Sequence, residues 1–195
     1  MKRKIIIFTL LITLGFVVFK RVKKIDPNTK FEIGQAIDSL NHVKVFYNGG
    51  VDHVLERNVQ DGYNIGLKYQ CVEFVKRYYY EHLSHKMPDS YGHAVSFFDK
   101  TLADNTYNKQ RDLWQYTNPS ILKPKVGDLV IFDGTPSNKY GHVAIISNVS
   151  EDEIEIIQQN PGPFAPSRVT ISLTTHGNDY WKIENDRILG WLRKK

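Results

Sequence analysis

The residue that stands out chemically is Cys71, the only cysteine among 195 residues. A lone cysteine excludes an intramolecular disulfide framework and any zinc or iron–sulfur site that needs several cysteines. Most single cysteines are buried and inert, but Cys71 lies in the first turn of a predicted helix. There the free backbone N–H groups and the positive end of the helix dipole favour a thiolate, the nucleophilic form of the side chain. The same N–H groups can hold the oxyanion of a tetrahedral intermediate.

A thiol nucleophile needs a base, and His142 is the best candidate among the seven histidines. It follows Gly141 at the start of an apolar segment, which suits an imidazole that projects into a cleft from a strand end. The alternative is a half-buried strand residue with one satisfied nitrogen. His82 and His85 lie three residues apart but have no third ligand in reach, so we predict no metal site. A cysteine on a helix followed by a histidine on a strand is the order in papain-like enzymes.

The third position of such a site orients the imidazole, and Gln158 is its candidate. In the predicted strand that begins at Ile154, alternation puts Gln158 on the face of Ile154 and Ile156. If that face lies beside the His142 strand, Gln158 points toward the imidazole, whereas Glu155 cannot without a register slip. A neutral amide can accept the ring N–H, although it stabilises an imidazolium less than a carboxylate would. The alternative is an ordinary polar residue at a strand end.

The body of the chain predicts one helix followed by strands. Residues 68–83 carry apolar side chains at three- and four-residue spacings with charges between them, which is typical of an amphipathic helix. After a loop-rich stretch with a short helix near residues 94–102, apolar segments bounded by turn residues predict strands. These segments are 129–132, 141–147, 154–158, 169–173 and 188–192. The pattern predicts an α+β fold in which the helix with the cysteine packs on an antiparallel sheet.

Positive charge is concentrated at the N-terminus. Residues 1–24 hold seven of the 26 Lys and Arg side chains and no acids, which leaves 19 basic against 21 acidic side chains in the other 171 residues. The body is therefore slightly acidic. Because nucleic-acid binding requires a basic folded surface, we expect no nucleic-acid partner.

A mostly apolar segment, residues 5–19, lies between two basic clusters. At about 1.5 Å per residue it spans roughly 22 Å, against a hydrocarbon core of ~30 Å, so lysines at its ends would have to snorkel. No small-residue cleavage pattern follows it. We therefore predict a single-pass membrane anchor over 1–24, a tether over 25–43, and a catalytic domain over 44–195 outside the cytoplasm. A cleaved signal peptide and a buried helix are the alternatives.

Four segments together resemble the CHAP family, the cysteine- and histidine-dependent amidohydrolases and peptidases, and within it the glutathionylspermidine amidases. They are YQCVEFVKR at 69–77, GDLVIF at 127–132, GHVAII at 141–146 and QQN at 158–160. The resemblance implies a papain-like fold with Cys71 as the nucleophile and His142 as the general base and later the acid. The third residue would be Gln158, where the glutathionylspermidine amidases have a glutamate, so this chain departs from the pattern.

The resemblance also implies three substrate-binding residues. Gln70 precedes the nucleophile as in those enzymes, and Asn160 also matches. Lys76 replaces an arginine and could meet a substrate carboxylate only if it points into the cleft.

Together these observations predict a membrane-anchored thiol amidohydrolase that works through a thioester and needs no cofactor. Because the predicted anchor places the domain outside the cytoplasm, we predict peptidoglycan peptides as the substrate. The alternative is a glutathione–polyamine amide, which the closer sequence likeness favours. The alternative from another class is a non-catalytic, membrane-anchored binding domain, and Gln158 is the only feature in its favour. The sequence contains no indication of the oligomeric state.

Overall fold

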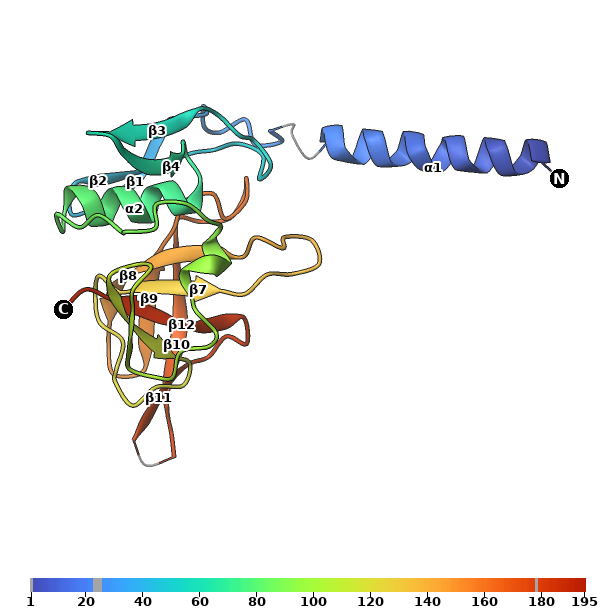
Figure 1. Ribbon diagram of the computed structural model, residues 1–195. Helices are drawn as coiled ribbons and strands as arrows, with labels where there is room; N and C mark the ends of the chain where they lie inside the picture. Colours follow the sequence, from blue (N-terminus) through green and yellow to red (C-terminus); the bar gives the residue numbers. More distant parts are fainter. Residues whose placement is uncertain (1, 23–25, 178) are drawn as a thin grey trace.

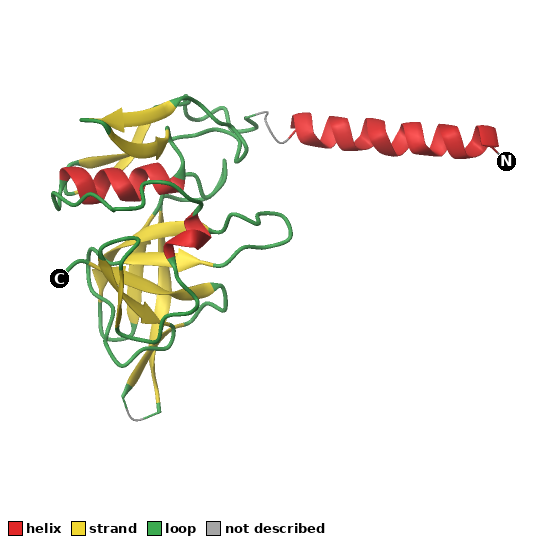
Figure 2. Ribbon diagram, viewed as in Figure 1, coloured by secondary structure: helices red, strands yellow, loops and turns green. Residues whose placement is uncertain are grey.

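The computed structural model describes residues 2–22, 26–177 and 179–195. This described part contains two α-helices, α1 (Lys2–Val22) and α2 (Cys71–Glu81), and a short 3-10 helix, η1 (Ala94–Phe97). Its twelve strands form one eight-stranded antiparallel sheet and two hairpins (Figures 1 and 2). The helix that begins at Cys71 does pack on an antiparallel sheet, but the fold is mostly β. The predicted α+β, papain-like class therefore fits only loosely and is corrected.

The eight-stranded sheet has the order β11-β10-β9-β8-β7-β12-β6-β5. Its strands are β5 (Thr106–Asn108), β6 (Leu113–Thr117), β7 (Leu129–Phe132), β8 (His142–Val149), β9 (Glu153–Ile157), β10 (Arg168–His176), β11 (Tyr180–Ile183) and β12 (Ile188–Arg193). The hairpins are β1 (Ala36–Leu40) with β2 (Val43–Phe46), and β3 (Arg57–Gln60) with β4 (Tyr63–Leu67). The five strands predicted from apolar segments correspond to β7, β8, β9, β10 and β12. The other strands were not predicted; they are short, and the alternation in β2, where Val43 and Val45 are buried on either side of an exposed Lys44, was an available signal.

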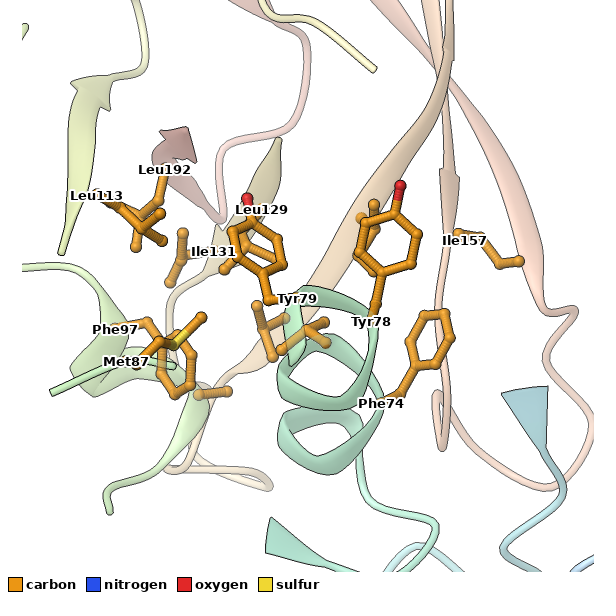
Figure 3. Close-up of a cluster of buried hydrophobic side chains, with 14 of the residues drawn as sticks. Phe74, Tyr78, Tyr79, Met87, Phe97, Leu113, Leu129, Ile131, Ile157 and Leu192 are labelled. Carbon is orange, nitrogen blue, oxygen red and sulfur yellow. The ribbon is translucent and has the colours of Figure 1, made fainter. Parts of the chain in front are cut away.

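The helix α2 lies between the two hairpins and the eight-stranded sheet (Figure 1). Its apolar side chains Phe74, Tyr78 and Tyr79 project toward the sheet, where they meet Leu129 and Ile157 (Figure 3). The opposite face of the sheet is buried in a second apolar cluster. Because both faces of the central strands are covered, these strands are continuously apolar, and their burial fixes the position of α2.

The segment before the body is folded onto it. Residues 36–46 form the β1–β2 hairpin, and Tyr47 Oη donates a hydrogen bond of 2.6 Å to Asp26 Oδ1. Farther along, Asn28 Nδ2 donates to the carbonyl oxygen of Pro163 at 2.6 Å. Much of the segment from residue 26 to residue 43 therefore has fixed contacts with the body.

The predicted membrane anchor is not supported. Among the described residues, no helix combines the length and the apolar character needed to cross a bilayer. The single-pass anchor, the membrane partner and the location in the cell membrane with an extracytoplasmic domain are therefore corrected. The physical reason is the short apolar segment, roughly 22 Å against ~30 Å, which the prediction extended with flanking lysines. Two of those, Lys23 and Lys24, lie outside the described residues.

We predict that Phe74→Ala lowers the free energy of unfolding by about 3–5 kcal/mol, because it removes a large, fully buried side chain between α2 and the sheet. Urea denaturation measures the change. The control is Val126→Ala, at a side chain that is 56% exposed, where we expect a change within about 0.5 kcal/mol. Equal effects of the two substitutions would contradict the packing described for α2.

Candidate active site

The helix α2 begins at Cys71, directly after an extended residue, Gln70, that serves as its N-cap. The Gln70 side chain makes no capping hydrogen bond to the helix. Its amide instead donates to the carbonyl oxygen of His53 at 2.7 Å and accepts from Asn160 Nδ2 at 2.8 Å. The first N–H groups of α2 thus lack a side-chain cap and remain available to the thiol or to a ligand.

The Cys71 thiol is held in a desolvated position. Burial raises its pKa, and this effect outweighs the N–H groups of Val143, Val72 and Cys71 itself, which lower it. The contact with Val143 puts the sulfur atom against the start of β8, directly beside His142. The sequence predicts a thiolate stabilised by the helix terminus, but in the structure desolvation dominates. The resting side chain is therefore a neutral thiol.

The imidazole of His142 lies at the first residue of β8. Gly141 before it has φ +70°, and a Cβ there would lie 2.5 Å from the carbonyl oxygen of Phe132. Only glycine allows the chain to pass so close to the end of β7 and to start β8 at this point. Burial lowers the pKa of His142 to about 4; the Gln158 hydrogen bond raises it, and the charge of Arg187 lowers it. The resting imidazole is therefore also neutral.

Gln158 orients the imidazole. Its Nε2 donates to the carbonyl oxygen of Pro166 at 3.1 Å, which assigns the other amide atom, Oε1, as the acceptor from His142 Nε2–H at 2.9 Å. That assignment leaves His142 Nδ1 with its lone pair free. Ile145 pairs with Ile157 in the antiparallel β8–β9 ladder. Gln158 therefore lies on the same face of the sheet as His142, offset from it by two residues along the strand. Glu155 points elsewhere, to Arg168.

Cys71 and His142 line the same cavity, which has a volume of about 580 Å³. Gln70 and Asn160 also line it. Because their side-chain amides bond to each other, they join the start of α2 to the chain just after β9. Asn160 adopts φ +54°, a left-handed conformation that asparagine tolerates better than most residues.

Two predicted site residues do not line this cavity: Gln158, which reaches it only through its hydrogen bond to His142, and Lys76. The Lys76 side chain is 1% exposed, and its Nζ donates to the carbonyl oxygens of Asn64 and, at 2.7 Å, of Ser90. Burial, together with the charges of Arg111 and Arg57, lowers its pKa to about 8. The predicted contact of Lys76 with a substrate carboxylate has no basis in this geometry.

Sequence reasoning missed Gln159, which is fully buried beside the site. Its Nε2 donates to the carbonyl oxygen of Gln70 at 3.0 Å and to Glu73 Oε2 at 2.9 Å, and its Oε1 accepts from the Phe46 N–H at 2.7 Å. Glu73 in turn pairs with Arg77 at 2.7 Å. The glutamine and asparagine run at 158–160, just after an apolar strand, was the available signal for this polar network.

Residues 60–160 match the CHAP domain, and this match covers more than half of the chain. The chain belongs to the CHAP family. The family prediction made from the four sequence segments is thereby confirmed. Membership supports a hydrolase of the amidase or peptidase type.

Curated relatives agree with this assignment. The chain is 31% identical to trypanothione synthetase from Crithidia fasciculata over 58% of its own length and 18% of the relative. It is 28% identical to glutathionylspermidine synthase from the same organism, over 66% of this chain and 19% of the relative. It is 32% identical to the bifunctional glutathionylspermidine synthetase/amidase of Escherichia coli, over 56% and 18%. The chain thus spans less than a fifth of these proteins.

Solved structures show a weaker likeness. The crystal structure of Ly7917 with the hydrolyzing product of MDP shares 21% sequence identity and a TM-score of 0.38, covering 65% of this chain and 54% of the other. A second structure of Ly7917 has 20% identity and a TM-score of 0.35.

The low pKa of His142 predicts an acid-sensitive fold. Between pH 6.5 and about 4 the unfolded chain binds a proton at this residue and the folded chain does not, so the free energy of unfolding falls as the pH falls. In His142→Asn, which cannot ionise, that part of the pH dependence should be missing. Urea denaturation of both proteins at pH 7 and pH 4.5 measures it. Identical pH dependences would contradict the neutral, desolvated imidazole.

Proposed function

We propose that this protein is a cysteine amidohydrolase that cleaves an amide bond through a thioester intermediate. The observation that carries the proposal is that the Cys71 thiol and the His142 imidazole line one cavity while Gln158 orients the ring. Family membership supports the same reaction class. No cofactor is needed for this chemistry, because the thiol and the imidazole supply the nucleophile and the proton carrier.

The first half of the reaction forms the acyl enzyme. As Cys71 Sγ bonds to the substrate carbonyl carbon, its proton passes to Nδ1 of His142, the nitrogen left free by the bond to Gln158. The oxyanion that forms is stabilised by the uncapped N–H groups at the start of α2. The imidazolium then protonates the leaving nitrogen, the C–N bond breaks, and an amine leaves a thioester on Cys71.

The second half returns the enzyme to its resting state. His142 accepts a proton from water as the hydroxyl oxygen attacks the thioester carbonyl. The C–S bond breaks, the carboxylic acid leaves, and the proton returns to the thiol. Because burial keeps both groups neutral at rest, proton transfer accompanies the attack rather than preceding it.

For the substrate we propose an amide between a peptide acyl group and an amine, with glutathionylspermidine as the first compound to test. The names of two relatives contain this compound, and one of the two is named as its synthetase and amidase. Peptidoglycan peptides are the second candidate because they contain the same kind of amide bond. The preference for them depended on an anchor that would place the domain outside the cytoplasm, and the described residues contain no helix that could serve as one.

Incubation of the full chain with each substrate separates the two. We expect release of free spermidine from glutathionylspermidine and no new amine from purified peptidoglycan. Amine release from peptidoglycan alone would overturn the proposed substrate but leave the reaction class intact.

We predict that Cys71→Ser and His142→Ala each reduce kcat by at least about a thousandfold, because each removes one half of the nucleophile and base pair. Near-UV and far-UV circular dichroism should be unchanged. His53→Ala is the control, because only its backbone carbonyl takes part in the network at Gln70. Full activity in Cys71→Ser would refute the thioester route.

The rival explanation is a binding domain that has lost catalysis. Iodoacetamide labelling across pH distinguishes the two. A rate profile of Cys71 alkylation that His142→Ala leaves unchanged would favour the inactive domain.

We predict that Gln158→Glu preserves or increases kcat, because a carboxylate stabilises the imidazolium better than an amide does. The same change should lower the free energy of unfolding by about 1–3 kcal/mol, since the second carboxylate oxygen would face the carbonyl oxygen of Pro166. Steady-state kinetics and urea denaturation measure the two effects. A large loss of kcat in a folded Gln158→Glu protein would refute the orienting role of residue 158.

A further inference from the structure

Two buried cations, Lys76 and Arg111, take no part in the proposed reaction. Each side chain is 1% exposed. Lys76 projects from α2, and Arg111 lies in the turn between β5 and β6. Within the described part of the chain, Lys76 forms no ion pair, and Arg111 approaches only the half-exposed carboxylate of Asp89, at 3.9 Å. Burying a charge with so little ionic compensation costs free energy, so the hydrogen bonds of these two side chains must offset that cost.

Both cations bind the same segment. Lys76 Nζ donates to the carbonyl oxygen of Ser90 at 2.7 Å. Arg111 Nη1 donates to the carbonyl oxygens on either side, those of Asp89 at 2.6 Å and Tyr91 at 3.3 Å. Three successive carbonyl groups are therefore held by charge-assisted hydrogen bonds from two different elements of the fold.

This segment, residues 89–93, lacks regular secondary structure, and its residues 90–93 line the cavity that contains Cys71 and His142. The ring of Tyr91 lies 5.4 Å from the guanidinium of Arg57, and the ring of His93 lies 4.4 Å from that of Tyr140, just before β8. An irregular segment needs donors for its carbonyl groups from elsewhere. Here those donors are Lys76 and Arg111, with an additional bond from Asn64 Nδ2 to Ser90.

We propose that Lys76 and Arg111 are positioning residues that hold segment 89–93 as a preformed wall of the cavity. The proposal rests on the proposed function for its kinetic consequence. Because the wall contacts the bound substrate rather than the reacting atoms, its loss raises KM and leaves kcat nearly unchanged. The role is indirect, since neither cation lines the cavity. Besides the wall, Lys76 binds the carbonyl oxygen of Asn64, and Arg111 binds Ser96 through its carbonyl oxygen at 3.0 Å and its Oγ at 3.4 Å.

The charge on Lys76 predicts that a rise in pH weakens substrate binding and stabilises the fold. The charged groups around Nζ are Arg111, Arg57 and Asp89, and the ring of Tyr63 lies 4.6 Å away. Burial lowers the pKa of Lys76 to about 8, so above that pH it loses the charge that strengthens its bond to Ser90 and KM rises. Over the same interval, up to about pH 10.5, the unfolded chain keeps this proton, so Lys76 makes the free energy of unfolding increase. A merely structural role would not weaken substrate binding while the fold becomes more stable.

The test compares Lys76→Met, Lys76→Arg and Lys86→Met in the full chain. Methionine keeps the apolar stem of the side chain and removes the donor, so we expect a folded protein. Lys86 is an exposed lysine near the same Tyr63 ring, which makes it the matched control. In Lys76→Met we expect KM for glutathionylspermidine to rise about tenfold, as for one lost hydrogen bond, and kcat to change less than about twofold. Lys76→Arg should restore most of the affinity, and Lys86→Met should match the wild type.

Hydrogen exchange provides a readout that needs no turnover. The N–H of Asp89 bonds to the carbonyl oxygen of Gln110 at 2.9 Å, and that of Tyr91 to Asp89 Oδ1 at 3.0 Å. These two amides should exchange at least about tenfold faster in Lys76→Met and at the wild-type rate in Lys86→Met. If Lys76→Met does not fold, Arg111→Lys, which keeps the charge but loses the fork, gives the same measurement.

Two results would overturn the proposal: unchanged exchange of these amides in a folded Lys76→Met, or a fall in kcat with KM unchanged. Failure of the wild-type protein to cleave any amide would overturn the proposed function instead, and the exchange rates would still decide whether the two cations hold the wall.

Discussion

The site depends on the hydrogen bonds that join the chain just after β9 to the start of α2. Three successive side chains each hold a different group: Gln158 the imidazole, Gln159 the carbonyl and carboxylate of the first helical turn, and Asn160 the side chain of Gln70. Since β8 and β9 are paired, one short polar run fixes the distance between the helix that carries the thiol and the strand that carries the imidazole. Among the described residues, Asn160 Oδ1 is buried with no hydrogen-bond partner, so the network fixes the geometry of the site and carries one unsatisfied acceptor.

Desolvation decides the electrostatics of this site. Burial raises the pKa of Cys71 and lowers that of His142, so a neutral pair is preferred over a thiolate and an imidazolium. Gln158 suits this state because its amide accepts one hydrogen bond from the ring and donates another to Pro166, which a carboxylate could not do. The departure from the glutamate of the glutathionylspermidine amidases therefore matches its surroundings.

Lys76 shows how a residue that resembles a substrate ligand can instead support the wall of the cavity without contacting the substrate. It is separated from the cavity by the segment that it binds, and Arg111 approaches that segment from a different element. The two buried charges, the irregular wall and the catalytic pair form successive layers. This arrangement explains why charged residues are tolerated in an otherwise apolar interior.

The sequence by itself determined the family, the helix at Cys71, the five apolar strands and the pairing face of Gln158, because all of these depend on local spacing and periodicity. The tertiary structure decided which effects prevail where distant segments meet. Burial from several elements controls the pKa values of Cys71 and His142, and the contacts of Lys76, Arg111 and Gln159 join residues far apart in the chain. The sequence likewise did not predict that β structure predominates, since the formation of short strands depends on the strands with which they pair. The prediction of a membrane anchor was wrong because the apolar segment is short, and the prediction assumed that the lysines at its ends would snorkel to the bilayer surface.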